Sequence, residues 1–149
     1  MTHVRTAALL ALLVVLLAVP AGASATSPEM KLFQKVNAFR AKHGLPKLHL
    51  SHSLAHSARS YSRHMLHSGY FGHSSRIHAS RRFRTLGEII ELHRGTRPRP
   101  SLAFRDWLNS GPHRSVIMMR QFRYAGAGVA SGRFHGRRSS LWTMQFGRR

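Results

Sequence analysis

Apolar residues recur at helical spacing in three stretches of the chain, and each stretch has its own start or stop signals. The first predicted helix begins at Ser27–Pro28–Glu29, where a capping hydroxyl, a proline and an acid suit a first turn, and it ends before Gly44. The second begins after the cap Ser51 and ends at Gly69, and the third begins near Ser101. The predicted buried stripes of these helices contain Leu32, Phe33, Val36 and Phe39, then Leu54, Ala55, Ala58, Tyr61, Met65 and Leu66, then Leu102, Ala103, Phe104, Trp107 and Leu108.

The last part of the chain has the pattern of strands. Leu, Thr and Gln alternate with Trp, Met and Phe over residues 141–146, which predicts a half-buried strand. Residues 124–130 form its expected partner, and residues 132–138 the turn of an antiparallel hairpin. A short helix is expected near residues 79–83 and one further helical turn at 114–119, after a break at Gly111–Pro112. Helices followed by a hairpin predict an α+β fold.

The N-terminus has the layout of a secretory signal peptide. Arg5 precedes an apolar run over residues 7–19, and small residues that suit cleavage after Ala23 or Ala25 follow. The run has 13 residues, fewer than the roughly 20 that a membrane span needs, although an uncleaved anchor is the competing interpretation. We therefore expect a signal peptide over residues 1–25, a single domain over residues 26–149, secretion, and no transmembrane span in the mature protein.

The composition is strongly basic and lacks cysteine. The chain has 24 Lys and Arg against 4 Asp and Glu, a net charge of +20, which favours anionic cell-envelope polymers or lipids as partners. Codon bias and solubility are the alternative explanation of this charge. Nucleic acid is disfavoured, because the aromatic residues do not interleave with the basic runs as a stacking platform would.

Glu88 is the carboxylate with the most apolar sequence neighbours, because it lies between Gly87 and two isoleucines. A carboxylate in apolar surroundings needs a cation, a hydrogen-bond donor or a metal ion. One of the many arginines could supply the partner. The alternative is a shared site with His73 and His113, since neutral imidazoles and a carboxylate are suitable zinc ligands. The i, i+4 pair of His52 and His56 is expected to be solvated surface.

Four short patches resemble the bacterial secreted branch of the CAP superfamily (the SCP or pathogenesis-related-1 domain). They are Phe71–Ser74, Gly87–Ile90, Trp107–Arg114 and Leu141–Gly147, and the resemblance spans about residues 31–147. It implies a three-layer α-β-α sandwich in which a small antiparallel sheet is flanked by helices. It also implies that His73, Glu88 and His113 line one cleft as ligand or metal contacts.

The chain departs from the family pattern at several positions. Ile89 replaces the usual asparagine, and Ser110 and Leu141 stand where other members have a second glutamate and a second histidine. A reduced set of this kind would favour Zn²⁺ over Ca²⁺. The leading hypothesis is a secreted binding module whose cleft holds a divalent metal or a small ligand, including a lipid. The alternatives are a metal-dependent hydrolase of peptide or cell-wall material, and a polycationic binder of anionic envelope surfaces.

Overall fold

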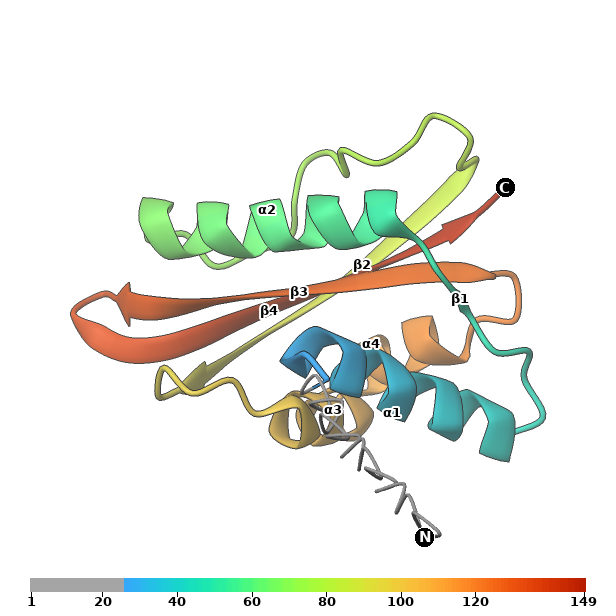
Figure 1. Ribbon diagram of the computed structural model, residues 1–149, viewed down its shortest axis with the longest axis horizontal. Helices are drawn as coiled ribbons and strands as arrows, with labels where there is room; N and C mark the ends of the chain where they lie inside the picture. Colours follow the sequence, from blue (N-terminus) through green and yellow to red (C-terminus); the bar gives the residue numbers. More distant parts are fainter. Residues whose placement is uncertain (1–25) are drawn as a thin grey trace, which may run out of the picture.

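The computed structural model describes residues 26–149, so the predicted signal peptide lies outside the described residues. Four helices surround a four-stranded sheet (Figure 1). In chain order the elements are α1 (Pro28–Lys42), β1 (His49–Leu50), α2 (His52–Ser68), β2 (Thr85–Arg94), α3 (Pro100–Asn109), α4 (Gly111–Met118), β3 (Tyr124–Phe134) and β4 (Arg137–Arg148). None of the helices in this described part is long and apolar enough to cross a membrane.

The predicted helix ends are confirmed by the local geometry. Ser27 accepts a hydrogen bond from the backbone N–H of Met30, and Ser51 accepts one from that of Leu54. Gly69 closes α2 with φ of 68°, in the left-handed region that favours glycine. The short helix expected near residues 79–83 is absent, and a turn occupies residues 81–82 instead.

The sheet has the strand order β1-β3-β4-β2. Strand β4 is antiparallel to both of its neighbours, β3 and β2. The two-residue strand β1 joins β3 in parallel, so the sheet is mixed rather than purely antiparallel. Helix α2 covers one face, and α1, α3 and α4 cover the other (Figure 1), which gives the expected three layers.

Strand β4 is buried on both faces, so the prediction of a half-buried strand was wrong. Thr143 and Gln145 are both fully buried, because α2 packs closely over that face. The approach is close because β3 has glycines beneath the helix. A Cβ at Gly126 would collide with the backbone of Ala55, and one at Gly128 with the backbone of Arg59.

The larger core lies between the sheet and the layer of α1, α3 and α4. Its fully buried members include Leu32, Trp107, Ile117 and Met144. Arg40 of α1 is also fully buried, and its guanidinium donates to the backbone carbonyls of Pro46, Ile117, Met119 and Phe122 at 2.6–3.1 Å. These bonds tie the end of α1 to the segment between α4 and β3.

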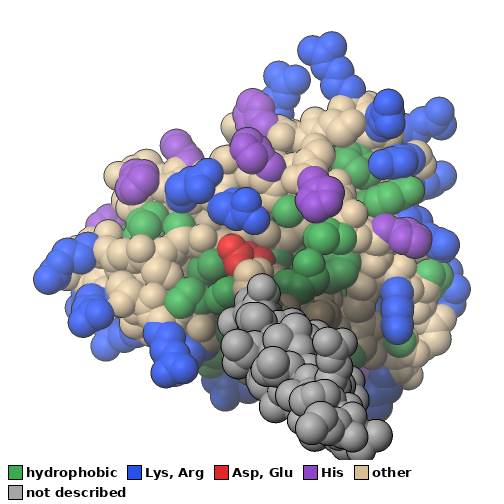
Figure 2. All heavy atoms as spheres, viewed as in Figure 1, with side chains coloured by type: hydrophobic (Ala, Val, Ile, Leu, Met, Phe, Trp, Pro, Cys, Tyr) green, Lys and Arg blue, Asp and Glu red, His purple; other side chains and the backbone are tan. Residues whose placement is uncertain are grey.

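The surface reflects the basic composition. Figure 2 shows Lys and Arg side chains spread around the face that it draws, with acidic side chains visible in only one small area.

Candidate functional site

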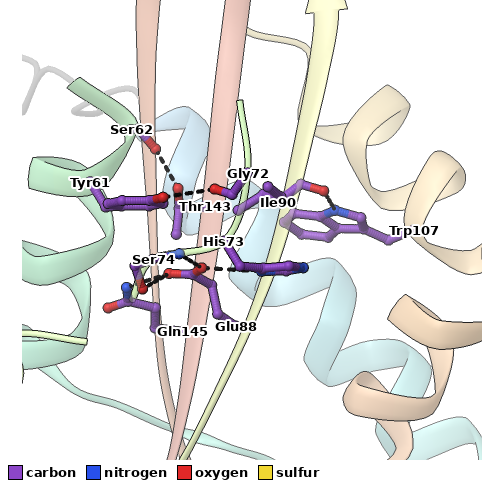
Figure 3. Close-up of polar contacts among 10 residues, drawn as sticks. All are labelled: Tyr61, Ser62, Gly72, His73, Ser74, Glu88, Ile90, Trp107, Thr143 and Gln145. Atoms are coloured by element: carbon purple, nitrogen blue, oxygen red, sulfur yellow. Dashed lines mark hydrogen bonds and ion pairs between the residues drawn. The ribbon is translucent and has the colours of Figure 1, made fainter. Parts of the chain in front are cut away.

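The candidate site begins with Glu88 on β2, whose Cα lies opposite that of Gln145 on β4. Its side chain is only 5% exposed. Gln145 Nε2 donates to Glu88 Oε2 at 2.8 Å. The segment after α2 supplies two more donors: the backbone N–H of Ser74 to Oε1 at 2.9 Å, and its hydroxyl to Oε2 at 3.0 Å. Glu88 therefore ties this segment to two strands of the sheet (Figure 3).

His73 supplies the fourth contact of the carboxylate. Its Nδ1 lies 3.2 Å from Glu88 Oε1, while 58% of the imidazole side chain is exposed. The side chains that contact the Glu88 carboxylate are thus His73, Ser74 and Gln145, and not one of the arginines that the sequence left as an alternative. Each carboxylate oxygen accepts two hydrogen bonds, which fills its lone pairs.

His113 lies in the first turn of α4, near His73. Burial lowers the pKa of His113, and the nearby imidazole of His73 lowers it further, so both effects favour its neutral form. Within residues 26–149, no hydrogen bond or ion pair joins His113 to Glu88. The fold brings the three predicted residues into one region, but only two of them are in contact.

The predicted three-ligand metal set is not assembled in this arrangement. Across the described part of the chain, no group of three or more His, Asp or Glu side chains is close enough to hold a metal ion. Ser110 lies at the junction of α3 and α4, and Leu141 is fully buried. The donor chemistry of Glu88 points the same way, since both its oxygens are already occupied. Metal binding by His73, Glu88 and His113 therefore stays a prediction from the sequence.

Tyr61 of α2 holds the other end of the same segment. Its hydroxyl donates to the carbonyl oxygen of Gly72 at 2.7 Å. Burial, followed by the negative charge of Glu88 and by Tyr70, raises the pKa of Tyr61 to about 12. At any physiological pH the Tyr61 phenol is protonated, so its hydroxyl can donate this hydrogen bond.

A cavity of about 420 Å³ lies beside this network, between α2 and residues 74–78. Every lining residue carries a hydroxyl, imidazole, guanidinium or amide group, and none is acidic: His56, Ser57, Ser60, Tyr61, His64, Ser74, Ser75, Arg76, His78 and Gln145. Gln145 is fully buried, and its Oε1 has no hydrogen-bond partner. We call this space the α2 cavity.

Sequence reasoning missed Ser74, Tyr61 and Gln145 as members of the site. A signal existed for Gln145, because a polar residue alternating with Thr143 on an otherwise apolar strand needs a polar neighbour. Tyr61 was assigned to the buried stripe of its helix, which conceals the role of its hydroxyl. Ser74 gave no signal, because its bonds to Glu88 depend on how the segment after α2 returns to the sheet.

A second carboxylate–imidazole pair lies three residues further along β2, in the layer between the sheet and α3. His93 Nδ1 is 3.1 Å from Glu91 Oε2, and both side chains are at least nine-tenths buried. Burial raises the pKa of Glu91, and the contact with His93 opposes part of that shift. His93 Nε2 and Trp142 Nε1 are buried there without partners.

Comparisons with known proteins agree with the observed fold and with the family that the four sequence patches resemble. A family model described as CAP, the cysteine-rich secretory protein family, matches residues 33–146. The protein YkwD of Bacillus subtilis is 33% identical over 136 residues, which cover 85% of this chain and 49% of YkwD. The membrane protein YlbC of the same organism is 30% identical over 113 residues, covering 70% of this chain and 32% of YlbC. The chain therefore spans about half or less of the length of these relatives.

Solved structures support the same assignment. An extracellular protein from Bacillus anthracis that contains an SCP domain has a TM-score of 0.68 and 27% identity, over 82% of this chain and 40% of that one. An outer surface protein of Borrelia burgdorferi has a TM-score of 0.67 over 80% of this chain and 92% of that one, and at 18% identity it shows the fold alone.

Proposed function

This chain belongs to the cysteine-rich secretory protein (CAP) family, and from that premise we propose that it acts outside the cytoplasm as a binding domain. Its ligand would be a small, hydroxyl-rich molecule held in the α2 cavity. Secretion is supported by the signal-peptide pattern of residues 1–25 and by the extracellular protein among the similar structures.

The observation that carries this proposal is the α2 cavity, in which every lining residue carries a polar group. Ligand sites in proteins are concave and have a few polar groups in fixed positions. Here the Glu88 network holds Ser74 and Gln145 in place, and Tyr61 fixes Gly72. The wall of the cavity is thus organised before any ligand arrives, which lowers the entropic cost of binding.

The lining also indicates the chemistry of the ligand. The four serine hydroxyls of the lining can each donate to and accept from a hydroxyl group of a ligand. Arg76 and three imidazoles, with no lining acid to compete, suit an acceptor or an anionic group on the same molecule. A sugar unit, and an acidic sugar in particular, satisfies both requirements, whereas a fatty acyl chain would leave these polar groups without partners.

The hydrogen bonds that Glu88 accepts favour a binding function over a hydrolytic one. A general base needs a free lone pair within reach of the proton that it removes. All four acceptor positions of Glu88 are filled by donors of this chain. The carboxylate is therefore suited to hold the segment after α2 in place.

The test is a titration of the protein with glucose, glucuronate and decanoate, followed by NMR chemical-shift changes. We expect saturable binding of the two sugars, with glucuronate tighter. Ser60→Trp should block the cavity and abolish binding. His67→Trp, at an exposed position of the same helix and outside the lining, should leave it unchanged. Binding of decanoate alone, of none of the three probes, or of sugar equally by Ser60→Trp would refute the proposal.

A further inference from the structure

A second concave surface lies in the layer opposite α2, where the loop before α3 meets the start of α1. It has a volume of about 870 Å³ and is lined by Pro28, Lys31, Arg97, Pro98, Arg99, Pro100, Ser101, Leu102 and Arg105. We call it the α1–α3 groove. Its four charged lining residues are all cations, and all four are exposed.

We propose that the α1–α3 groove is a docking site for a flexible, linear polymer that carries its charge in phosphate groups. The proposal is independent of the ligand of the α2 cavity, because helices that cover opposite faces of the sheet form the two hollows (Figure 1). One face would thus attach the domain to a polyanion while the other stays open.

Prolines limit the backbone conformations of two of the cations in the groove. Arg97 and Arg99 each precede a proline, and the residue before a proline is disfavoured from helical conformations. Arg99 has φ of −120° and ψ of 86°, outside the helical region. A backbone that is already restricted has less conformational entropy to lose when the two guanidinium groups bind a charged chain.

Negative charge that could neutralise the groove is scarce. Asp106 contacts Arg105 at 3.4 Å, in a pair that is largely exposed and therefore weak. Arg99 Nη2 donates to the carbonyl oxygen of Arg94 at 3.3 Å, and Arg99 forms no ion pair within residues 26–149, although its charge acts on the buried Glu91. The first turn of α3 contains no acidic residue. For Lys31 and Arg97 no ion pair occurs within residues 26–149.

The donor types favour phosphate over other anions and over nucleic-acid bases. Three of the four cations are arginines, whose forked donors bind phosphate oxygens in pairs. The lining has prolines but no aromatic side chain, so it offers no platform on which bases could stack. The groove is therefore suited to the charged backbone of a polymer and not to base recognition.

The experiment measures binding of long-chain inorganic polyphosphate to the purified protein over a range of salt concentrations. The test variant combines K31A, R97A, R99A and R105A. The matched control combines R63A, R81A, R82A and R137A, which removes the same charge from exposed positions outside the groove. Circular dichroism melting curves establish that both variants are folded.

We expect the groove variant to bind at least tenfold more weakly at about 0.1 M salt. The slope of log K against log salt should fall by about 3, at roughly 0.7 for each lost phosphate contact, and the control should keep the slope of the original protein within about 1. Equal losses in both variants would mean that the general charge of the protein binds the polymer. That result would overturn the proposal, as would tighter binding of poly-L-glutamate or of single-stranded DNA than of polyphosphate.

Discussion

Strand β2 carries two carboxylates, three residues apart, that face opposite sides of the sheet and have different polar partners. Glu88 faces the α2 side, accepts four hydrogen bonds and lies beside a cavity. Glu91 faces the α3 side, where its partner is His93 and its pKa is raised by burial. The pair of Glu91 and His93 looks more like a reactive centre, yet none of the cavities described above is lined by either residue. A perturbed carboxylate indicates a site only where a ligand can reach it.

The comparison also separates two structural roles. Glu88 organises a segment of irregular backbone at the edge of the sheet, so its loss should release that segment. Glu91 and His93 lie within a packed layer next to Trp142, whose Nε1 is also without a partner. Their contribution to folding is set by the cost of burying a charge.

The largest expected effect is the loss of stability in Glu88→Ala. Its removal leaves the buried donors of Ser74 and Gln145 without their acceptor, and we expect a cost of about 3–5 kcal/mol in the free energy of unfolding. Urea denaturation measures it. Glu29→Ala is the matched control, because its contact with Arg59 at 3.8 Å is long and near the surface, and it should cost less than about 1 kcal/mol. Equal costs would show that Glu88 does not anchor the segment.

A smaller effect, with a defined sign, is expected from Glu91→Gln. Because the pKa of Glu91 is raised above its ordinary value of 4.5, the folded chain holds this proton more tightly than the unfolded chain does. The stabilisation is complete below pH 4.5 and declines as the pH rises through the folded-state pKa. The side-chain amide introduced by Glu91→Gln does not ionise. The stability of the variant should therefore rise relative to that of the original protein as the pH increases above 4.5.

The gain in the free energy of unfolding should be about 1.4 kcal/mol for each unit by which the pKa of Glu91 in the folded chain exceeds that in the unfolded chain. Thermal unfolding at several pH values measures it, with Glu29→Gln as the control because Glu29 is only partly buried. Parallel stability curves for the original protein and Glu91→Gln would contradict the assignment of a buried, destabilised charge on this side of the sheet.

The smallest expected effect concerns metal. Because no three-donor group is formed within residues 26–149, Zn²⁺ should shift the melting temperature of the tag-free protein and of a His73→Ala, His113→Ala variant equally. A His52→Ala, His56→Ala variant reports binding to the helix surface. A Zn²⁺ stabilisation that disappears only when His73 and His113 are removed would instead establish the metal site that the sequence predicts.

The part of the site that could be predicted is the part with local evidence. Glu88 was identified because two apolar neighbours make a carboxylate costly, and His73 and His113 because of their motifs. Gln145 was not, because its contact with Glu88 joins strands 57 positions apart through their register. The alternation on β4 predicted a strand correctly but not its burial on both faces, which depends on α2 and on the glycines beneath it.

By itself the sequence determined the three major helices, the caps at Ser27, Ser51 and Gly69, the α+β class and the basic surface. These depend on hydrogen bonds and periodicities within a few residues, or on composition alone. Only the tertiary structure decided that Glu88 meets Ser74 and Gln145 and not an arginine, and that a cavity lies beside them. The pairing of distant strands and the packing of a helix over them arise from the whole chain, because each contact gains its energy only when all the others have formed.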